Sequence, residues 1–203
     1  MDRKGILLIV SGPSGSGKGT VVEILTKEKD YFLSVSATTR DPRPYEREGE
    51  HYFFMKKDEF LSQAEKGEFL EWAEFCGNCY GTPKKKVLES LNEGKNIILE
   101  IEVQGALQVK RDFPEAVLIF MIPPSAEELR RRLTGRGTES EEVISERIKR
   151  SLEELDIALG YDYLVINEEA SKCAEILKTI VFAEKLRLSR NKNIIEKFKG
   201  EVI

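Results

Sequence analysis

Residues 6–20 read Ile-Leu-Leu-Ile-Val-Ser-Gly-Pro-Ser-Gly-Ser-Gly-Lys-Gly-Thr. The five apolar residues at the start predict a strand buried on both faces, as in a parallel sheet. The next part matches G-x-x-x-x-G-K and leads into a predicted helix at 18–27, the context that identifies a phosphate-binding loop (P-loop). Such a loop turns backbone N–H groups toward phosphate oxygens, and its lysine adds a positive charge. We expect a nucleotide to contact Gly12, Ser14, Gly15, Ser16, Gly17, Lys18, Gly19 and Thr20.

One position in this loop departs from the common pattern. Most P-loops carry Ser or Thr directly after the lysine, whereas here Gly19 follows and the hydroxyl comes at Thr20. The usual direct hydroxyl ligand of Mg²⁺ is therefore absent. We expect the metal to be held mainly by nucleotide phosphates and waters, with Thr20, Glu100 and Glu102 acting through water. We name no direct metal ligand.

Glu100 and Glu102 come at the end of a predicted buried strand, residues 96–102. Because they are two residues apart, we expect both on one face of that strand. Ligands of open parallel sheets gather at this end of the strands. The two carboxylates therefore belong to the predicted site.

Alternating strands and helices predict the fold class. Further strands are expected at 33–36, 116–122 and 163–167, and further helices at 82–94 and 170–189. This alternation predicts a three-layer α/β fold with a central parallel sheet, the P-loop NTPase fold. Two regions interrupt it. The first, 36–86, has strands of a small sheet at 52–54 and 69–72 and a helix at 58–66. The second, 127–158, has charged helices that start from a capping box at Ser125. We predict a single domain with a core of 1–35, 87–126 and 159–203 and two inserted lobes.

Composition argues against several classes of function. The net charge of −4 argues against a broad nucleic-acid surface. No apolar run approaches the ~20 residues of a membrane span, and the start of the chain does not resemble a secretory signal. We therefore expect a cytoplasmic protein with no nucleic-acid or membrane partner. Cys76, Cys79, Cys173 and His51 do not complete a zinc ligand set, so reduced thiols are expected.

Two arginines three residues apart, Arg40 and Arg43, lie in a loop rich in Arg, Pro and Glu. A guanidinium can bind phosphate oxygens in a bidentate manner, so the pair would suit a monophosphate. Composition alone would favour a solvated loop. The Tyr52 and Tyr80 hydroxyls are candidates for the same phosphate, or the rings could serve packing.

Several motifs, in order along the chain, resemble those of guanylate kinases. They are Ser-Gly-Pro-Ser-Gly-x-Gly-Lys at 11–18, Ser-x-Thr-Thr-Arg-x-Pro-Arg at 36–43, Glu-Phe-x-Glu-Trp-Ala at 68–73, Gly-Asn-x-Tyr-Gly-Thr at 77–82, Ile-Glu-x-x-Gly-Ala at 101–106, Pro-Pro-Ser at 123–125, Gly-Arg-Gly-Thr-Glu-Ser at 135–140 and Val-Ile-Asn at 165–167. The resemblance runs from about residue 5 to residue 186. It implies that ATP phosphorylates GMP, with dGMP as a second acceptor, giving ADP and GDP in purine metabolism and GMP recycling.

The resemblance also implies roles for the acceptor lobe, 36–86. Arg40, Arg43, Tyr52 and Tyr80 would hold the GMP phosphate, and Ser36, Glu71 and Thr82 would read the guanine. A carboxylate at Glu71 can accept from guanine N1–H and the 2-amino group, a donor pair that adenine lacks, so AMP would be rejected. Glu100 and Glu102 stand where the family often has aspartate, at positions that contact guanine and organise magnesium. Cys79 stands where an aromatic residue is frequent.

The second lobe, 127–158, resembles the family's mobile lid. Arg132, Arg136 and Arg147 match its arginines, and Gly135 and Gly137 flank Arg136. Closure would exclude water and balance the charge of the transferring group, although each arginine could instead lie on a solvated helix face. Asn167 is a candidate for the adenine. Lys18, Arg40, Arg136 and Arg147 form the expected catalytic set for in-line transfer, which relies on positioning and charge neutralisation.

Two alternatives remain open on sequence. One is a catalytically silent peptide-binding module of guanylate kinase type, and the other is a kinase for AMP or UMP. Retention of Lys18 and the lid arginines disfavours the first, and Glu71 with Ser36 and Thr82 disfavours the second. We expect ATP and GMP as partners and no obligatory protein partner, with the oligomeric state undecided.

Overall fold

The computed structural model describes residues 4–75, 77–135 and 141–202. Its central sheet has five parallel strands in the order β2-β7-β1-β8-β9. The strands are β1 (Leu7–Ser11), β2 (Tyr31–Leu33), β7 (Asn96–Glu100), β8 (Val117–Ile122) and β9 (Tyr163–Ile166). Strand β1 lies in the middle, so the loop that follows it leaves the sheet at the centre of its C-terminal edge.

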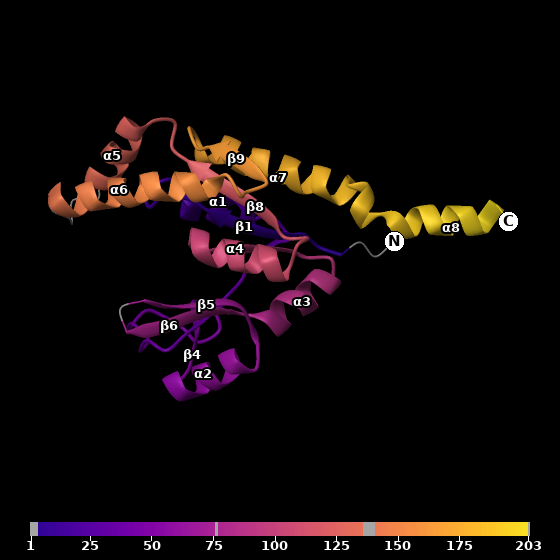
Figure 1. Ribbon diagram of the computed structural model, residues 1–203, viewed down its shortest axis with the longest axis horizontal. Helices are drawn as coiled ribbons and strands as arrows, with labels where there is room; N and C mark the ends of the chain where they lie inside the picture. The colour runs from indigo at the N-terminus through magenta and orange to yellow at the C-terminus, as the bar shows by residue number, and fades with distance from the viewer. Residues whose placement is uncertain (1–3, 76, 136–140, 203) are drawn as a thin grey trace.

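Helices cover both faces of this sheet (Figure 1). Side chains alternate along β1: Leu8 and Val10 pack against α1 (Lys18–Thr26) and α7 (Ala170–Leu186). Leu7 and Ile9 pack on the opposite face, against α3 (Lys84–Asn92) and α4 (Val103–Asp112). All five residues of β1 are buried, as a central parallel strand requires. The predicted three-layer α/β architecture is confirmed.

A second sheet, of four strands in the order β4-β3-β6-β5, forms a separate lobe below α4 in Figure 1. It comprises β3 (Ser36–Thr38), β4 (Tyr52–Phe54), β5 (Phe69–Phe75) and β6 (Asn78–Pro83), with α2 (Lys57–Glu65) packed on it. Its small core contains Ala37, Phe60, Phe69 and Cys79, and the Phe60 and Phe69 rings stack 4.4 Å apart. This core of its own keeps the lobe folded beside the main sheet.

Two helices extend past the C-terminal edge of the central sheet: α5 (Ala126–Thr134) and α6 (Glu141–Ala158) (Figure 1). The Ser125 hydroxyl accepts a 3.0 Å hydrogen bond from the Glu128 backbone N–H, which confirms the predicted start of α5. Leu129, Leu133 and Ile144 join the two helices through a small apolar cluster. The limits that we gave the two lobes, 36–86 and 127–158, stay predictions.

Several element boundaries differ from those predicted. The strand expected at 33–36 is two strands, β2 in the central sheet and β3 in the second sheet, because the chain crosses between sheets there. Thr82 and Pro83 do not lie in the first turn of a helix, although Pro83 is the N-cap of α3. They end β6, where Pro83 pairs with Phe69 of β5, and α3 begins at Lys84.

The strand expected at 96–102 ends at Glu100, which pairs with Val10 of β1. Glu102 is instead the N-cap of α4, so the two carboxylates do not share one strand face. Helix α4 itself was not predicted. It contains Gly105, a poor helix former, and it is stabilised by burial of Val103, Ala106 and Val109. The 3₁₀ turn Leu188–Arg190 and helix α8 (Lys192–Val202), which continues away from the sheet in Figure 1, were also not predicted.

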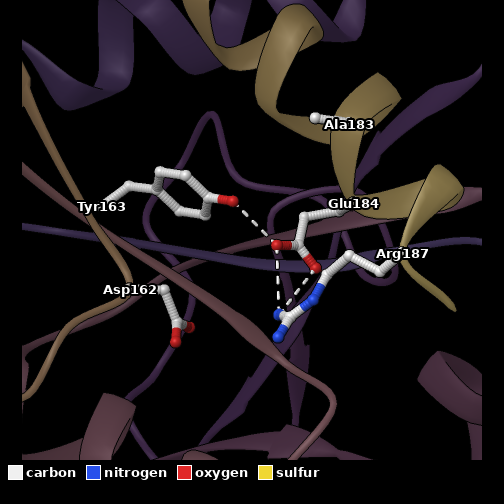
Figure 2. A pocket seen from close by; sticks show the side chains of 5 residues that line it. All are labelled: Asp162, Tyr163, Ala183, Glu184 and Arg187. Atoms are coloured by element: carbon white, nitrogen blue, oxygen red, sulfur yellow. Dashed lines mark hydrogen bonds and ion pairs between the residues drawn. The ribbon is translucent and has the colours of Figure 1, made fainter. Parts of the chain in front are cut away.

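The N-terminal edge of the sheet carries a polar pocket of about 410 Å³ between β9 and the end of α7. Figure 2 shows Tyr163 and Arg187 directed at the carboxylate of Glu184. The Tyr163 hydroxyl donates at 2.8 Å, Arg187 Nη1 at 3.3 Å and Arg190 Nη2 at 3.1 Å. Burial acts to raise the pKa of Glu184, but these hydrogen bonds lower it. The Glu184 carboxylate in this pocket thus accepts hydrogen bonds from three side chains, at the edge of the sheet remote from the loop.

No helix among the described residues is long and apolar enough to cross a membrane.

Candidate active site

The backbone of the loop between β1 and α1 is shaped by glycine. Gly12 has φ 142°, and a Cβ at this position would lie 2.0 Å from the Met121 carbonyl oxygen. Gly17, the N-cap of α1, has φ 87°, and a Cβ there would lie 2.4 Å from Asn167 Nδ2. A side chain at Gly12 would displace the backbone of β8, and one at Gly17 would displace the Asn167 amide and strain a left-handed backbone. The result is a tight turn at a helix N-terminus, a geometry suited to phosphate.

Lys18 follows this turn, and its ammonium folds back over the loop. Lys18 Nζ donates to the Gly12 carbonyl at 2.5 Å and to the Pro13 carbonyl at 3.1 Å. The Ser16 side chain is fully buried, and no described residue offers its hydroxyl a hydrogen bond. Buried polar atoms without a partner are rare in proteins. A phosphate oxygen in the loop would give the Ser16 hydroxyl a partner.

Arg132 and Asn167 hold the loop from the other side. Arg132 Nη1 donates to the Ser16 carbonyl at 3.2 Å, and Nη2 donates to the Asn167 carbonyl at 3.0 Å. Asn167 Nδ2 donates to the same Ser16 carbonyl at 2.8 Å. Glu128 accepts from Arg132 Nε at 2.7 Å, and its hydrogen bonds to Arg131 and Arg132 lower its pKa to about 2. Both predicted residues thus lie directly against the loop.

Glu100 faces the position where Gly19 departs from the common motif. A Cβ built at Gly19 would lie 3.7 Å from Glu100 Oε2, an ordinary contact. Glu100 reaches solvent, yet its pKa is raised above the ordinary value, mainly because the carboxyl is partly enclosed. The Glu102 carboxylate adds to this rise, and the Lys18 ammonium opposes it. The described residues hold no cluster of three or more His, Cys, Asp or Glu side chains fit to bind a metal alone. A carboxylate such as that of Glu100 fits a Mg²⁺ that keeps several waters and its phosphate ligands.

Arg40 and Arg43, the arginines predicted to bind a monophosphate, are joined through Glu46. Arg40 Nη2 donates to both Glu46 carboxylate oxygens, at 2.8 and 3.0 Å. The Arg43 backbone N–H donates to Glu46 Oε2 at 2.7 Å, while Arg43 Nη1 donates to the Tyr45 hydroxyl at 3.0 Å. These hydrogen bonds, the one from Arg40 foremost, lower the pKa of Glu46. The Arg40 side chain and the Arg43 backbone therefore share one carboxylate.

Tyr52 and Tyr80 lie beside this pair of arginines. The Arg40 guanidinium carbon is 5.6 Å from the centre of the Tyr52 ring, and the Tyr52 and Tyr80 rings meet edge to face at 6.2 Å. Tyr52 stands on β4 opposite Ser36 of β3. The structure thus brings the predicted phosphate-binding residues together at one end of the small sheet.

Glu71 forms the buried end of the acceptor lobe. The Thr82 hydroxyl donates to Glu71 Oε1 at 2.6 Å, and both side chains are buried. Burial raises the pKa of Glu71, and the hydrogen bonds from Thr82 oppose the rise. A Cβ at Gly105 of α4 would lie only 3.1 Å from Glu71 Oε2. The carboxylate therefore lies between the small sheet and α4, and Gly105 provides the space.

The lid arginines are only partly described. Arg147 lies half-buried on α6, where its backbone carbonyl accepts from the Ser151 hydroxyl at 2.8 Å. Arg136 lies outside the described residues, as does Cys76. Cys79 and Cys173 are buried free thiols.

Glu46, Glu128 and Gly105 were missed as site residues in the sequence. Glu46 stands three residues after Arg43 and Glu128 four residues before Arg132. Such spacings are common for surface pairs as well, so they gave no specific signal. The proximity of Gly105 to Glu71 depends on helix α4, which the pattern did not predict.

Comparison with known proteins agrees with this geometry. The family model described as guanylate kinase matches residues 4–184. A guanylate kinase of Clostridioides difficile is 51% identical over 98% of both chains, and one of Caldanaerobacter subterraneus is 49% identical over 99% of this chain and 98% of its own. The crystal structure of guanylate kinase from Anaplasma phagocytophilum is similar with a TM-score of 0.73, at 34% identity, over 93% of this chain and 90% of that one.

Proposed function

The chain belongs to the guanylate kinase family and is an ATP:GMP phosphotransferase, and we propose how its residues divide that reaction. The loop of Gly12 to Thr20 binds the ATP phosphates, with Ser14, Gly15, Ser16, Gly17 and Gly19 lining it. Lys18 leaves the two loop carbonyls and moves to the terminal phosphates. The buried Ser16 hydroxyl, to which no described residue offers a hydrogen bond, supports this assignment.

Arg132 and Asn167 support the same end of the site. Their contacts with the Ser16 carbonyl fix the loop, which presents its N–H groups in one orientation. Such preorganisation lets the loop stabilise phosphate charge without rearranging. We also assign to Asn167 and Arg132 contacts with the nucleotide that emerges from the loop.

Mg²⁺ supplies charge neutralisation of the polyphosphate when it is bound. Glu100 faces Gly19, where most P-loops have a hydroxyl ligand. The charge of Glu102 acts to raise the pKa of Glu100. We propose that Thr20, Glu100 and Glu102 hold the metal through its waters. Glu100 and Glu102 act from two elements, the end of β7 and the cap of α4.

The GMP phosphate binds between Arg40, Arg43, Tyr52 and Tyr80. In the free protein Glu46 holds Arg40 in place through two hydrogen bonds, so the guanidinium is ordered before the anion arrives. Ordering of this kind reduces the entropy lost on binding. The two tyrosine hydroxyls complete the phosphate site.

Guanine is read by Glu71, with Ser36 and Thr82 beside it. Thr82 occupies Oε1, which keeps the carboxylate in one orientation and leaves Oε2 to accept from the base. Adenine lacks the donor pair and would leave a buried carboxylate unsatisfied, which is costly. This Thr82–Glu71 contact is the observation that carries the choice of GMP as acceptor.

The transfer itself is direct and in line. The acceptor is already an anion, so no strong general base is required. Lys18, Arg40, Arg136 and Arg147 neutralise charge as the phosphoryl group moves, and the lid excludes water. Because ATP and GMP are cytoplasmic metabolites, we assign the enzyme to the cytoplasm.

A coupled assay with ATP, Mg²⁺ and one monophosphate at a time tests this assignment. GMP should turn over fastest, dGMP should follow, and AMP and UMP should give little product. Preferred turnover of AMP would show that Glu71 does not read guanine. Absence of turnover with both GMP and dGMP would contradict the proposed site as a whole.

A further inference from the structure

Gly105 lies in the first turn of α4, three residues after the N-cap Glu102. Glycine is among the poorest helix formers, and alanine is the best. The φ angle of Gly105 is not positive, so the backbone conformation does not require glycine at this position. The reason for glycine here must therefore lie in the atoms that surround it.

The space beside Gly105 is filled by one side chain. A Cβ built at this position would lie 3.1 Å from Glu71 Oε2 and 3.6 Å from both Cδ and Cγ of Glu71. Beyond the helix itself, these three are its nearest neighbours among the described residues. A contact of 3.1 Å is tight for a Cβ, so the oxygen would have to move by a few tenths of an ångström. Glycine at this position thus leaves room for the Glu71 carboxylate in particular.

The Glu71 carboxylate has little freedom to move away. The Thr82 hydroxyl donates to Oε1 at 2.6 Å, and Glu71 is only 8% exposed. A rotation that withdraws Oε2 from α4 would change the direction in which Oε2 accepts, or it would lengthen the hydrogen bond from Thr82. Hydrogen bonds depend steeply on both angle and distance. A methyl group on residue 105 would therefore change how this carboxylate meets a base.

Glu71 and Gly105 belong to different parts of the molecule (Figure 1). Glu71 is on β5 of the second sheet, whereas α4 packs on the central sheet through Ala106 and Val109. The first turn of α4 has N–H groups with no partner inside the helix, and this positive end of a helix favours an ionised carboxylate. The central domain therefore faces Glu71 with a surface that gives it room and favours its charge.

We propose that Gly105 is a positioning residue for guanine recognition. Because it has no side chain, Glu71 can hold Oε2 toward the base while Thr82 holds Oε1. Gly105 acts through Glu71 and does not touch the reacting groups, so it determines the selectivity among monophosphates and not the rate of phosphoryl transfer. The inference rests on the proposed reading of guanine by Glu71.

Steady-state kinetics of Gly105→Ala test the proposal. A misdirected acceptor weakens binding of the base, so kcat/KM for GMP should fall about tenfold, mainly through a higher KM. AMP lacks the donor pair, so its kcat/KM should change by less than about threefold, as should KM for ATP. Alanine favours a helix, and a thermal melt should show that the variant is folded. Gly200→Ala is the matched control, since a Cβ at this position of α8 has no atom within 4 Å, and it should leave every constant unchanged.

A double-mutant cycle tests whether Gly105 acts through Glu71. When Glu71→Gln is already present, adding Gly105→Ala should change kcat/KM for GMP by less than about threefold, because no carboxylate is left to misdirect. Two results would overturn the inference. One is an unchanged kcat/KM for GMP in Gly105→Ala, and the other is a loss of the same size with and without Glu71→Gln.

Glu71→Gln alone separates these outcomes from failure of the proposed function. If this variant keeps the full preference for GMP over AMP, the proposed reading of guanine is wrong. If it loses the preference while Gly105→Ala has no effect, only the role of Gly105 is wrong.

Discussion

The Thr82 hydroxyl donates a 2.6 Å hydrogen bond to Glu71 Oε1, from β6 to the neighbouring strand β5 of the small sheet. Both groups are buried, and burial raises the pKa of the carboxyl. The protein thus maintains an acid in a position that disfavours its charge. We propose that a guanine base, which offers two N–H donors, compensates the burial of this carboxylate.

Glu71→Gln should separate specificity from stability. The amide oxygen can still accept from Thr82, but its NH₂ group opposes the guanine donors, so the preference for GMP over AMP should fall by at least about 100-fold. The measurement is kcat/KM for each monophosphate. Unchanged discrimination would show that another group reads the base.

The same variant should not be less stable at pH 7. The pKa of Glu71 is raised in the folded protein, so its ionisation disfavours folding above the folded-state pKa and has no effect below its ordinary value of 4.5. Glutamine removes this cost. Thermal melts should therefore show an equal or higher Tm at pH 7, with no advantage below about pH 4. A Tm far below that of the wild type at pH 7 would contradict this reading of the burial.

Glu46→Gln should weaken GMP binding without altering ATP binding. The substitution removes the charge that holds Arg40 and disturbs the acceptor of the Arg43 backbone N–H. Arg40 loses a charged hydrogen-bond partner that positions it, so KM for GMP should rise by roughly several-fold. Glu50→Gln is the control, because Glu50 is exposed and pairs only loosely with Arg47 at 3.7 Å. If both variants behave alike, Glu46 has no positioning role.

Glu184→Gln should affect stability and leave catalysis intact. Its carboxylate is 2% exposed and is bound by Tyr163 and Arg190, and loss of one partner of a buried pair costs about 3 kcal/mol. For a chain of this size, Tm at pH 7 should fall by about 6–12 °C. The pKa of Glu184 is lowered on folding, so its contribution is present above pH 4.5 and disappears as pH falls through the lower, folded value.

The difference in the free energy of unfolding between the wild type and Glu184→Gln should therefore become smaller in acid. Denaturant melts at pH 7 and pH 3 measure it. A constant difference across this range would mean that charge is not responsible. Reduced kcat at a temperature where the variant is folded would mean that this edge of the sheet is not independent of the active site.

Much of the fold could be predicted because the local signals agreed. The apolar run at 6–10 and the glycines after it predicted the central strand and the loop, and Ser125 predicted the start of α5. The split between β2 and β3 was missed because no local signal shows that a chain changes sheets between Leu33 and Ser36. Helix α4 was missed because Gly105 weakens its pattern while tertiary packing stabilises it.

The sequence could propose site residues where one side chain suits one ligand group, as for Lys18, Arg40 and Glu71, and their ligand contacts stay predictions. It could not do so where side chains act on one another. The link from Arg40 to Glu46 and the close approach of Gly105 to Glu71 depend on loop conformation and on the distance between separate elements. Those distances follow from the fold as a whole and leave no short motif.

The most direct measurement is the rate of GDP formation from ATP and GMP by Lys18→Ala, with circular dichroism and a thermal melt to confirm the fold. Lys18 Nζ donates to the Gly12 and Pro13 carbonyls of the loop, and we expect its removal to leave the sheet intact. Charge neutralisation at the transferring phosphoryl group should be lost, and kcat should fall by at least about 100-fold. A folded Lys18→Ala variant that forms GDP at a rate near that of the wild type would contradict phosphoryl transfer at this loop.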